Sequence, residues 1–333
     1  MTKNNKSLRN SFLLLLTAII WGTSFVAQSA GMEYIGPFTF SVTRYILGGT
    51  ILIPVIFFMN NLSKKSRLKD GISEDDIRRE DKEVFKRSVR YGIVCGIILC
   101  AASNFQQMAM LHASAGKAGF ITAFYIILVP IVGIFLKKKT SPIIWFCVLL
   151  ALVGLYFLCI GRGGEYVFEI SDVQLLMCAL IFSFHIIFVD YANTKKVNGV
   201  IISSMQFYTA ALISAFFVYP MDGVVYDMMP AMDLIIKAAP SILYSGIMSC
   251  GVAYTLQIIG QKDVNPTVAS LIMSLESVVS AISGFLILGQ KMSVDEIIGC
   301  VIMFVAIILA ELPIGRKNVK NSTVSSEKSL SSE

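Results

Sequence analysis

The residue in the most unusual setting for chemistry is Glu276, which lies in the middle of the apolar stretch Pro266–Gly289. As a helix, that stretch is long enough to cross the hydrocarbon core of a bilayer, about 30 Å. An ionisable group at that depth costs about 2.5–3.5 kcal/mol on insertion scales and is by default a functional hypothesis. We interpret Glu276 as a candidate proton-coupling group. The alternative is a protonated glutamate that only packs inside the bundle.

Two basic side chains also lie inside apolar segments, Arg44 and His185. If the helices of Arg44 and Glu276 run in opposite directions, the two side chains differ in depth by about 5 Å, which is compatible with one shared cavity. Depth alone leaves open whether they share it. Arg44 is predicted to bind a substrate carboxylate through its planar fork. The alternative partners are backbone carbonyls or a lipid headgroup. His185 is a second proton-coupling candidate, with a packing histidine as its alternative.

Neutral polar side chains in other apolar segments complete the candidate substrate site. Amides donate and accept hydrogen bonds without carrying charge, and amphipathic rings offer an apolar face with a polar tip. Such a set suits a substrate with an apolar body and a polar head. The alternative is hydrogen bonding between helices and interfacial anchoring. The predicted substrate-binding residues are Trp21, Arg44, Asn104, Gln106, Tyr125, Tyr254 and Gln257.

Composition places these residues in a polytopic, all-α integral membrane protein. The chain has 333 residues, of which 55% are hydrophobic and 15% charged, a balance typical of membrane proteins. A cleaved signal peptide, with small residues at 27–30, is the alternative for the first segment. The ten predicted membrane helices are residues 12–32, 37–59, 91–111, 116–136, 142–160, 171–190, 200–220, 239–260, 266–288 and 296–312.

The distribution of cations predicts the orientation. With the N-terminus in the cytoplasm, the Lys and Arg residues outside the spans lie on the cytoplasmic side except Lys117, Arg162, Lys237 and Lys291. This asymmetry predicts a multi-pass protein of the cytoplasmic membrane with both termini inside. The net charge of +6 does not indicate nucleic acid, because the cations cluster in short connections. The expected partners are a small substrate, membrane lipids and protons, and a homodimer is left open.

No cofactor or metal site is expected. All seven cysteines fall inside apolar segments without CxxC spacing, so we interpret them as small core residues. The sequence lacks GxxxxGK[ST], HExxH and paired aspartate-rich motifs, which argues against a nucleotide-driven pump or a metal-dependent enzyme.

The remaining segments are polar. Residues 1–11 are predicted to be cytoplasmic, and residues 313–333 to form a disordered cytoplasmic tail. In the cytoplasmic loop 60–90, Ser73 and Asp76 resemble a capping box. That pattern predicts a short helix lying against the lipid headgroups, with a solvated linker as the alternative.

The two halves of the sequence match at one constant offset. Ala102, Gln106, Ala118 and Gly133 are matched by Ala253, Gln257, Ala269 and Gly284. Five predicted helices precede five more, and because five is odd the second half must insert upside down. We therefore predict two inverted five-helix repeats, residues 12–160 and 171–312. Such repeats are typical of transporters, with a midplane site at their interface.

Three motifs resemble a known family. WGTSF at 21–25, GPFTFSVTRY at 36–45 and LESVVSAISGFLILGQKMSVDEIIGC at 275–300 are similar to the drug/metabolite transporter superfamily, specifically the ten-helix EamA-like exporters. The resemblance implies alternating access around a central cavity, without ATP. Family members usually have Glu-Pro where this chain has Glu276-Ser277, which removes a proline kink. They also have Gly-Glu where this chain has Gly289-Gln290.

The function expected from the sequence is secondary-active export of an amino-acid-like metabolite, with proton coupling at Glu276. Within the same class, the alternative is an exporter of cationic or amphipathic drugs. From other classes, the alternatives are an integral-membrane lipid-modifying enzyme and a receptor or scaffold. The protein is not expected to be an enzyme, because no nucleophile or metal constellation accompanies the buried charges.

Overall fold

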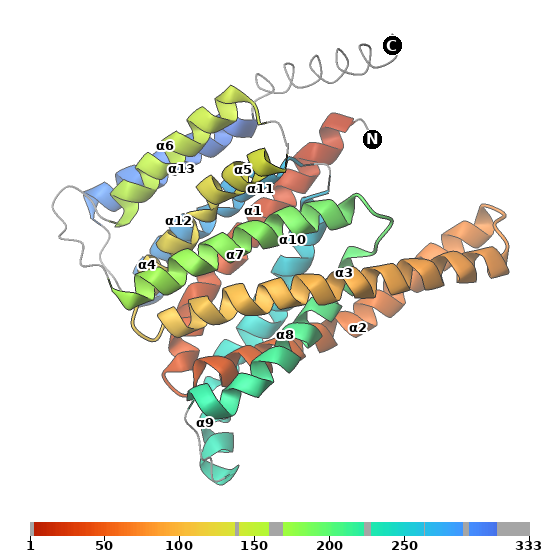
Figure 1. The fold of residues 1–333 in the computed structure, drawn as a ribbon, viewed down its shortest axis with the longest axis horizontal. Coiled ribbons are helices and arrows are strands. Elements are labelled where there is room, and N and C mark those ends of the chain that lie inside the picture. Colours follow the sequence, from red (N-terminus) through yellow and green to blue (C-terminus); the bar gives the residue numbers. More distant parts are fainter. Residues whose placement is uncertain are drawn as a thin grey trace.

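A computed structural model describes residues 3–136, 140–159, 169–222, 228–262, 264–288 and 293–311, and these ranges contain helices and no strand (Figure 1). The predicted tail 313–333 and the pair Gly289-Gln290 lie outside the described residues. The helices are α1 (Lys3–Met32), α2 (Pro37–Lys69), α3 (Glu74–Ala109), α4 (Ala115–Thr122), α5 (Tyr125–Phe135), α6 (Pro142–Cys159), α7 (Ile170–Asn193), α8 (Gly199–Asp222), α9 (Met228–Leu243), the π-helix η1 (Tyr244–Tyr254), α10 (Thr255–Gly260), α11 (Pro266–Met273), α12 (Leu275–Leu288) and α13 (Val294–Glu311).

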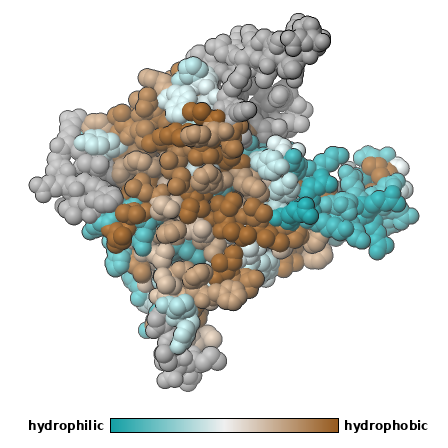
Figure 2. All heavy atoms as spheres, in the orientation of Figure 1, coloured by the Kyte–Doolittle hydropathy of each residue, from teal (hydrophilic) through white to brown (hydrophobic). Residues whose placement is uncertain are grey.

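The helices are those of a multi-pass membrane protein. Within the described ranges, eight helical segments are long and apolar enough to cross a membrane. Residues 142–157 and 297–310 form two shorter apolar helices. Apolar side chains cover most of the face shown in Figure 2, as expected for a surface that contacts lipid. The structure thus confirms an all-helical membrane protein.

The strongest helix contacts join the two halves of the sequence. Helix α8 packs along α2 and α3, α7 packs on α3, α12 on α1, and α13 on α6 (Figure 1). Small residues allow this close packing. A Cβ on Gly22 of α1 would lie 2.6 Å from the carbonyl oxygen of Glu276 in α12. A Cβ on Gly96 of α3 would lie 2.6 Å from the carbonyl oxygen of Gln206 in α8. Each half therefore forms its core against the other.

The first turn of α2 is capped by a residue from the other half of the chain. Pro37 opens the helix, and the preceding Gly36 has no side chain to cap it. Instead, Asp222 at the end of α8 accepts hydrogen bonds from the backbone N–H of Phe38 (3.2 Å) and of Thr39 (2.7 Å). A Cβ on Gly36 would lie 2.3 Å from the Asp222 carboxyl carbon. Glycine at this position is what admits the carboxylate.

Residues 60–90 form a projecting helical arm, whereas the sequence predicts a short separate helix; that this segment lies on the headgroups stays a prediction. Helix α2 continues to Lys69, and α3 begins already at Glu74. Ser73 caps α3 by accepting a hydrogen bond from the backbone N–H of Asp76 (3.2 Å), so the predicted capping residue is right. Gly71, with φ of 81°, makes the turn between the two helices, a conformation that glycine adopts without strain.

Charge pairing explains why the arm stands away from the bundle. Lys64 and Arg67 on α2 form ion pairs with Glu74 and Asp81 on α3, so the two helices bind each other through polar faces. Hydrophilic side chains gather on the arm in Figure 2. We attribute the difference from the sequence prediction to these cross-helix pairs.

Two predicted spans are interrupted near their middle. The span predicted at 116–136 consists of α4 and α5, and the span at 266–288 consists of α11 and α12 with Ser274 between them. The second break occurs without the family's proline, contrary to the kink-free helix that Ser277 predicts. Ser270, Ser274 and Ser277 each donate a hydrogen bond to the carbonyl oxygen three residues earlier, at 2.9, 2.8 and 2.7 Å. Such bonds compete with the helical pattern and bend helices.

The seventh long span contains a π-helical stretch. Residues 232–260 form one apolar segment, within which η1 replaces the α-helical pattern between α9 and α10. π-helical turns are rare and occur frequently at functional sites. In this protein the stretch carries Ser249 and Tyr254, which line the cavity described below.

The orientation of the arm is open to a direct test. If residues 60–90 are cytoplasmic, Asp70→Cys at the tip of the arm should react with a membrane-impermeant maleimide only after the cells are opened. His112→Cys, exposed just beyond α3, should react in intact cells. The six native cysteines whose side chains are described are buried, so background labelling should be low. Labelling of both sites from the same side would contradict the proposed topology.

Candidate substrate cavity

A single cavity in the middle of the bundle brings together residues from most parts of the chain. Its lining comes from α1, α2, α3, α4, α5, α7, η1, α10 and α12. It includes both a basic and an acidic side chain. The lining residues are Trp21, Phe25, Gln28, Arg44, Gln106, Thr122, Tyr125, Phe182, Ile186, Ser249, Tyr254, Gln257 and Glu276.

The cavity is narrow in this conformation. Its volume, measured as the space open to the centre of a water molecule, is about 30 Å³. A single water needs about 10–15 Å³ by this measure, so there is room for about two or three waters. A metabolite requires the surrounding helices to separate. The structure therefore places the polar groups together in a closed arrangement.

Arg44 lies buried on α2, at 4% exposure, in a neutral environment. One guanidinium nitrogen donates to the Gln28 side-chain oxygen. The other donates to Ser103 Oγ (2.8 Å) and to the Tyr45 hydroxyl (3.2 Å). Its charge centre lies 4.8 Å from the centroid of the Tyr45 ring. Within the described residues Arg44 has no acidic partner. A buried charge without a counter-ion is costly, so this setting favours an anionic group from outside the chain.

Glu276 lies in the first turn of α12, directly after the break at Ser274, and is 3% exposed. Its Oε1 accepts a hydrogen bond of 2.9 Å from the hydroxyl of Tyr125. Tyr125 is itself the first residue of α5, directly after the other break. The acid thus lies where two interrupted spans meet, and no ion pair joins it to Arg44 among the described residues.

Three polar groups on the lining, Arg44 among them, have hydrogen-bonding atoms without a partner in the described part of the structure. These atoms are Trp21 Nε1, Arg44 Nε and both amide atoms of Gln257. Trp21 packs on Tyr254, with ring centroids 4.6 Å apart. Buried polar atoms are normally hydrogen-bonded, so donors and an acceptor left open beside a cavity suit a polar ligand or ordered water.

The structure brings seven of the nine predicted site residues to this cavity and places two elsewhere. Asn104 faces α8, where its Nδ2 donates to Ser214 Oγ (2.8 Å) and contacts Cys100 Sγ. His185 lies behind the lining, with its Nε2 3.2 Å from Gln206 Oε1 and its ring against that of Tyr254. Both contacts are compatible with the alternative interpretations, a helix–helix hydrogen bond and a packing histidine, and the predicted roles of the two residues stay predictions.

Asn104→Ala is expected to lower stability without changing substrate affinity. The substitution removes the donor to Ser214, which is fully buried. The Ser214 hydroxyl keeps only a weak contact with Cys100 Sγ (3.5 Å), and a buried polar group that loses its main partner costs about 1–3 kcal/mol. Thermal unfolding of the purified protein would measure the loss, and KM for the substrate would serve as the control. A raised KM at unchanged stability would place Asn104 at the substrate instead.

Sequence reasoning missed six residues on the lining. Phe25, Phe182 and Ile186 look like ordinary apolar span residues, and Thr122 and Ser249 like small packing residues. Gln28 carried a usable signal, because an amide inside an apolar span is as costly as those at 106 and 257. It stands in the small-residue run at 27–30 that resembles a cleavage site, yet α1 continues through it and its side chain binds Arg44.

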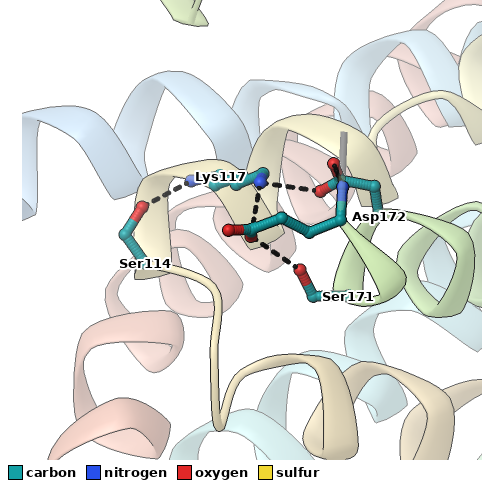
Figure 3. A network of polar contacts seen from close by, with 5 residues as sticks. Ser114, Lys117, Ser171 and Asp172 are labelled. Atoms are coloured by element: carbon teal, nitrogen blue, oxygen red, sulfur yellow. Dashed lines mark hydrogen bonds and ion pairs between the residues drawn. The ribbon is translucent and has the colours of Figure 1, made fainter. Parts of the chain in front are cut away.

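An ion cluster ties α4 to α7 at one end of the bundle (Figure 3). Lys117 Nζ lies 3.0 Å from Glu169 Oε2 and 2.9 Å from Asp172 Oδ1. Asp172 is 1% exposed and also accepts from the Glu169 backbone N–H, which caps α7. Ser114 caps α4 by accepting from the backbone N–H of Lys117 (3.2 Å). Because α4 and α7 also carry Thr122 and Phe182 of the cavity lining, the cluster holds two cavity walls together.

Lys117→Gln is expected to lower the thermal midpoint by several degrees. The change removes the cation from two carboxylates, one of them buried, and uncompensated buried charge is destabilising. The double variant Lys117→Gln/Asp172→Asn should recover much of the loss, because it also removes the buried charge. Unfolding curves of the three proteins measure this. A double variant that is no more stable than the single one would show that the ion pair is not the cause.

The fold and the cavity define a class, a multi-pass helical membrane protein with a polar site inside the bundle. The EamA-like transporter family model matches residues 9–160 and 170–312, and the chain belongs to that family. It thereby joins the drug/metabolite transporter superfamily, as the motifs indicated.

Two relatives of the chain are also named as transporters. The chain is 26% identical over 306 residues to a protein of Archaeoglobus fulgidus named an uncharacterized transporter, covering 90% of this chain and 84% of the relative. It is 18% identical to the uncharacterized transporter YoaV of Bacillus subtilis, covering 92% of this chain and 98% of the relative. A solved crystal structure with 17% identity superposes with a TM-score of 0.67, covering 92% of this chain and 98% of that one. The likeness to the crystal structure shows the fold. Family and relatives together point to a transporter and not to an enzyme.

Proposed function

We propose that the protein is a secondary-active transporter that exports a small amino-acid-like zwitterion across the cytoplasmic membrane. The observation that carries the proposal is the pair Arg44 and Glu276, which line one cavity without forming an ion pair with each other. A zwitterion offers a carboxylate for the guanidinium and an ammonium for the acid. Binding would supply each buried charge with its missing partner.

The proposed mechanism is alternating access by two inverted five-helix repeats, residues 12–160 and 171–312. The helix boundaries support it. Helices α4 and α11 each have eight residues and a side-chain N-cap, from Ser114 and Asn265. Tyr125 and Glu276, separated by 151 residues, take corresponding places after the two breaks. Discontinuous helices around a midplane site are a feature of this architecture.

Proton coupling would centre on Glu276. Its hydrogen bond to Tyr125 joins the two interrupted spans, so a change in its protonation alters a contact at the proposed repeat interface. His185, buried and bound to Gln206 behind the cavity wall, is the weaker candidate. In this scheme a proton and the substrate ammonium compete for the same carboxylate, which couples their movements in opposite directions.

An exporter of cationic or amphipathic drugs is the second candidate. The aromatic side chains of Trp21, Phe25 and Tyr254 and the acid Glu276 favour it, since a cation can stack on rings and pair with a carboxylate. A drug exporter differs from the proposed zwitterion exporter in its use of Arg44, because a substrate without an anionic group does not need that side chain.

Counterflow in proteoliposomes tests the proposal. Vesicles preloaded with an unlabelled amino acid should accumulate the labelled one, and an imposed pH gradient should drive uptake further. Each amino acid should be compared with its decarboxylated amine, which keeps the cation and loses the carboxylate. Transport of the amines alone would favour the drug exporter. No transport of either class in folded protein would contradict the proposal.

A further inference from the structure

A second, larger hollow lies away from the central cavity, between α1, α11 and α13. Its volume by the same measure is about 600 Å³, far more than the 30 Å³ of the central cavity. None of its lining residues belongs to the central site. They are Leu8, Arg9, Ser11, Phe12, Leu15, Ile272 and Ile307.

The hollow has the form of an apolar groove. One face of α1 carries Leu8, Phe12 and Leu15, which follow helical spacing. The distance from Leu8 to Leu15 is about 10 Å along the helix axis. Leu8 and Phe12 are 67% and 55% exposed, whereas Ile272 and Ile307 are 2% and 8% exposed. The first two therefore form the rim, and the isoleucines form the floor. Such a groove fits a flexible hydrocarbon chain.

One charged residue lines this groove, at the end where α1 begins. Among the residues that the structure describes, the Arg9 guanidinium donates only to the side-chain oxygen of Asn10, at 3.4 and 3.2 Å. In the described part of the chain it has no ion pair. Asn10 in turn donates to the backbone carbonyl of Lys262, which fixes this end of α1 against the bundle. The remaining guanidinium donors are available for an anion, and their fork matches a phosphate.

We propose that this groove binds an anionic phospholipid, with one acyl chain along the floor and the phosphate on Arg9. The combination of an apolar groove and an unpaired cation at its end favours this occupant over a neutral lipid. Basic pockets between membrane helices are known to bind anionic headgroups. Because α11 carries the floor residue Ile272 and ends at the break before Glu276, a bound lipid would stabilise one wall of the transport site.

Thermal unfolding of the full-length protein in neutral detergent tests this. Phosphatidylglycerol should raise the midpoint by several degrees more than phosphatidylcholine with the same acyl chains, because a ligand that binds the folded state stabilises it by mass action. Glycerol 3-phosphate, which has the charge and no chains, should have no effect. If phosphatidylcholine stabilises equally, or if glycerol 3-phosphate suffices, the proposal fails.

Variants locate the site. Arg9→Gln should abolish the preference for phosphatidylglycerol, whereas Lys262→Gln, a cation at the same end of the bundle that does not line the groove, should keep it. Ile307→Trp should fill the groove and reduce stabilisation by both lipids. The Arg9→Gln effect is a difference between the two lipids, and the Ile307→Trp effect is a difference between protein with and without lipid. Each comparison is made within one variant, so it is independent of that variant's own stability. A preference for phosphatidylglycerol that survives Arg9→Gln, or full stabilisation by both lipids in Ile307→Trp, would place the lipid elsewhere and overturn the proposal.

Discussion

Glu276→Gln is expected to abolish transport driven by a proton gradient while leaving the fold intact. The amide has nearly the same size as the acid and can still accept the hydrogen bond from Tyr125. It cannot exchange a proton, so it resembles the protonated carboxylic acid permanently. Gradient-driven flux should fall to that of protein-free liposomes, whereas substrate exchange at equal pH should partly survive.

Flux against external pH, for wild type and variant reconstituted at equal density, is the deciding measurement. Glu33→Gln is the matched control, because Glu33 is an exposed acid just beyond α1 and does not line the cavity. It should retain the wild-type pH dependence. If Glu276→Gln also retains it, Glu276 is not the coupling group, although the transporter fold would stand.

Arg44→Lys is expected to weaken binding of a zwitterionic substrate by about ten- to one-hundred-fold. The guanidinium binds Gln28, Ser103 and Tyr45 at once, and a single ammonium cannot keep these bonds and also grip a carboxylate with two parallel bonds. Losing one hydrogen bond to a charged group costs about 1.5–3 kcal/mol, which corresponds to that loss of affinity.

Binding of the zwitterion and of its decarboxylated amine should be compared in the same purified variant. A selective loss for the zwitterion indicates contact between Arg44 and the carboxylate. Arg87→Lys is the matched control, since Arg87 is a half-buried cation on the arm that does not line the cavity and should leave both affinities unchanged. Equal affinity of folded Arg44→Lys and wild type for the zwitterion would assign Arg44 to packing and favour the cationic substrate.

Much of the membrane fold was predictable because it depends on composition and length. Apolar stretches such as 266–288 must be helical in lipid, since backbone groups have no other partners there. The similar depth of Arg44 and Glu276 was predictable, because helical rise converts sequence position into distance along the membrane normal. That both line one cavity was not. The cost of polar groups in apolar spans was the basis for predicting four further site residues that line the cavity, Gln106, Tyr125, Tyr254 and Gln257.

The remaining details of the site depend on which face of a helix turns inward, and hydropathy does not report the orientation of a helix about its axis. The helix carrying Asn104 and Gln106 is polar on two faces, and only its packing against α8 shows that Asn104 binds Ser214. The arm was missed for a different reason. Its pairs, such as Arg67 with Asp81, form between helices whose relative register is not evident from the sequence. The break at Ser274 was missed because a serine is a weaker signal than a proline.

The cap on α2 has a consequence for biosynthesis. Chains enter the membrane from the N-terminus as they are made, so α2 is inserted long before Asp222 leaves the ribosome. Until then the N–H groups of Phe38 and Thr39 lack the carboxylate that later receives them. A chain stopped after residue 160 never acquires it. The first half is therefore expected to be recognised by membrane quality control as incomplete, and supplying residues 170–333 as a separate polypeptide should rescue it from proteolysis.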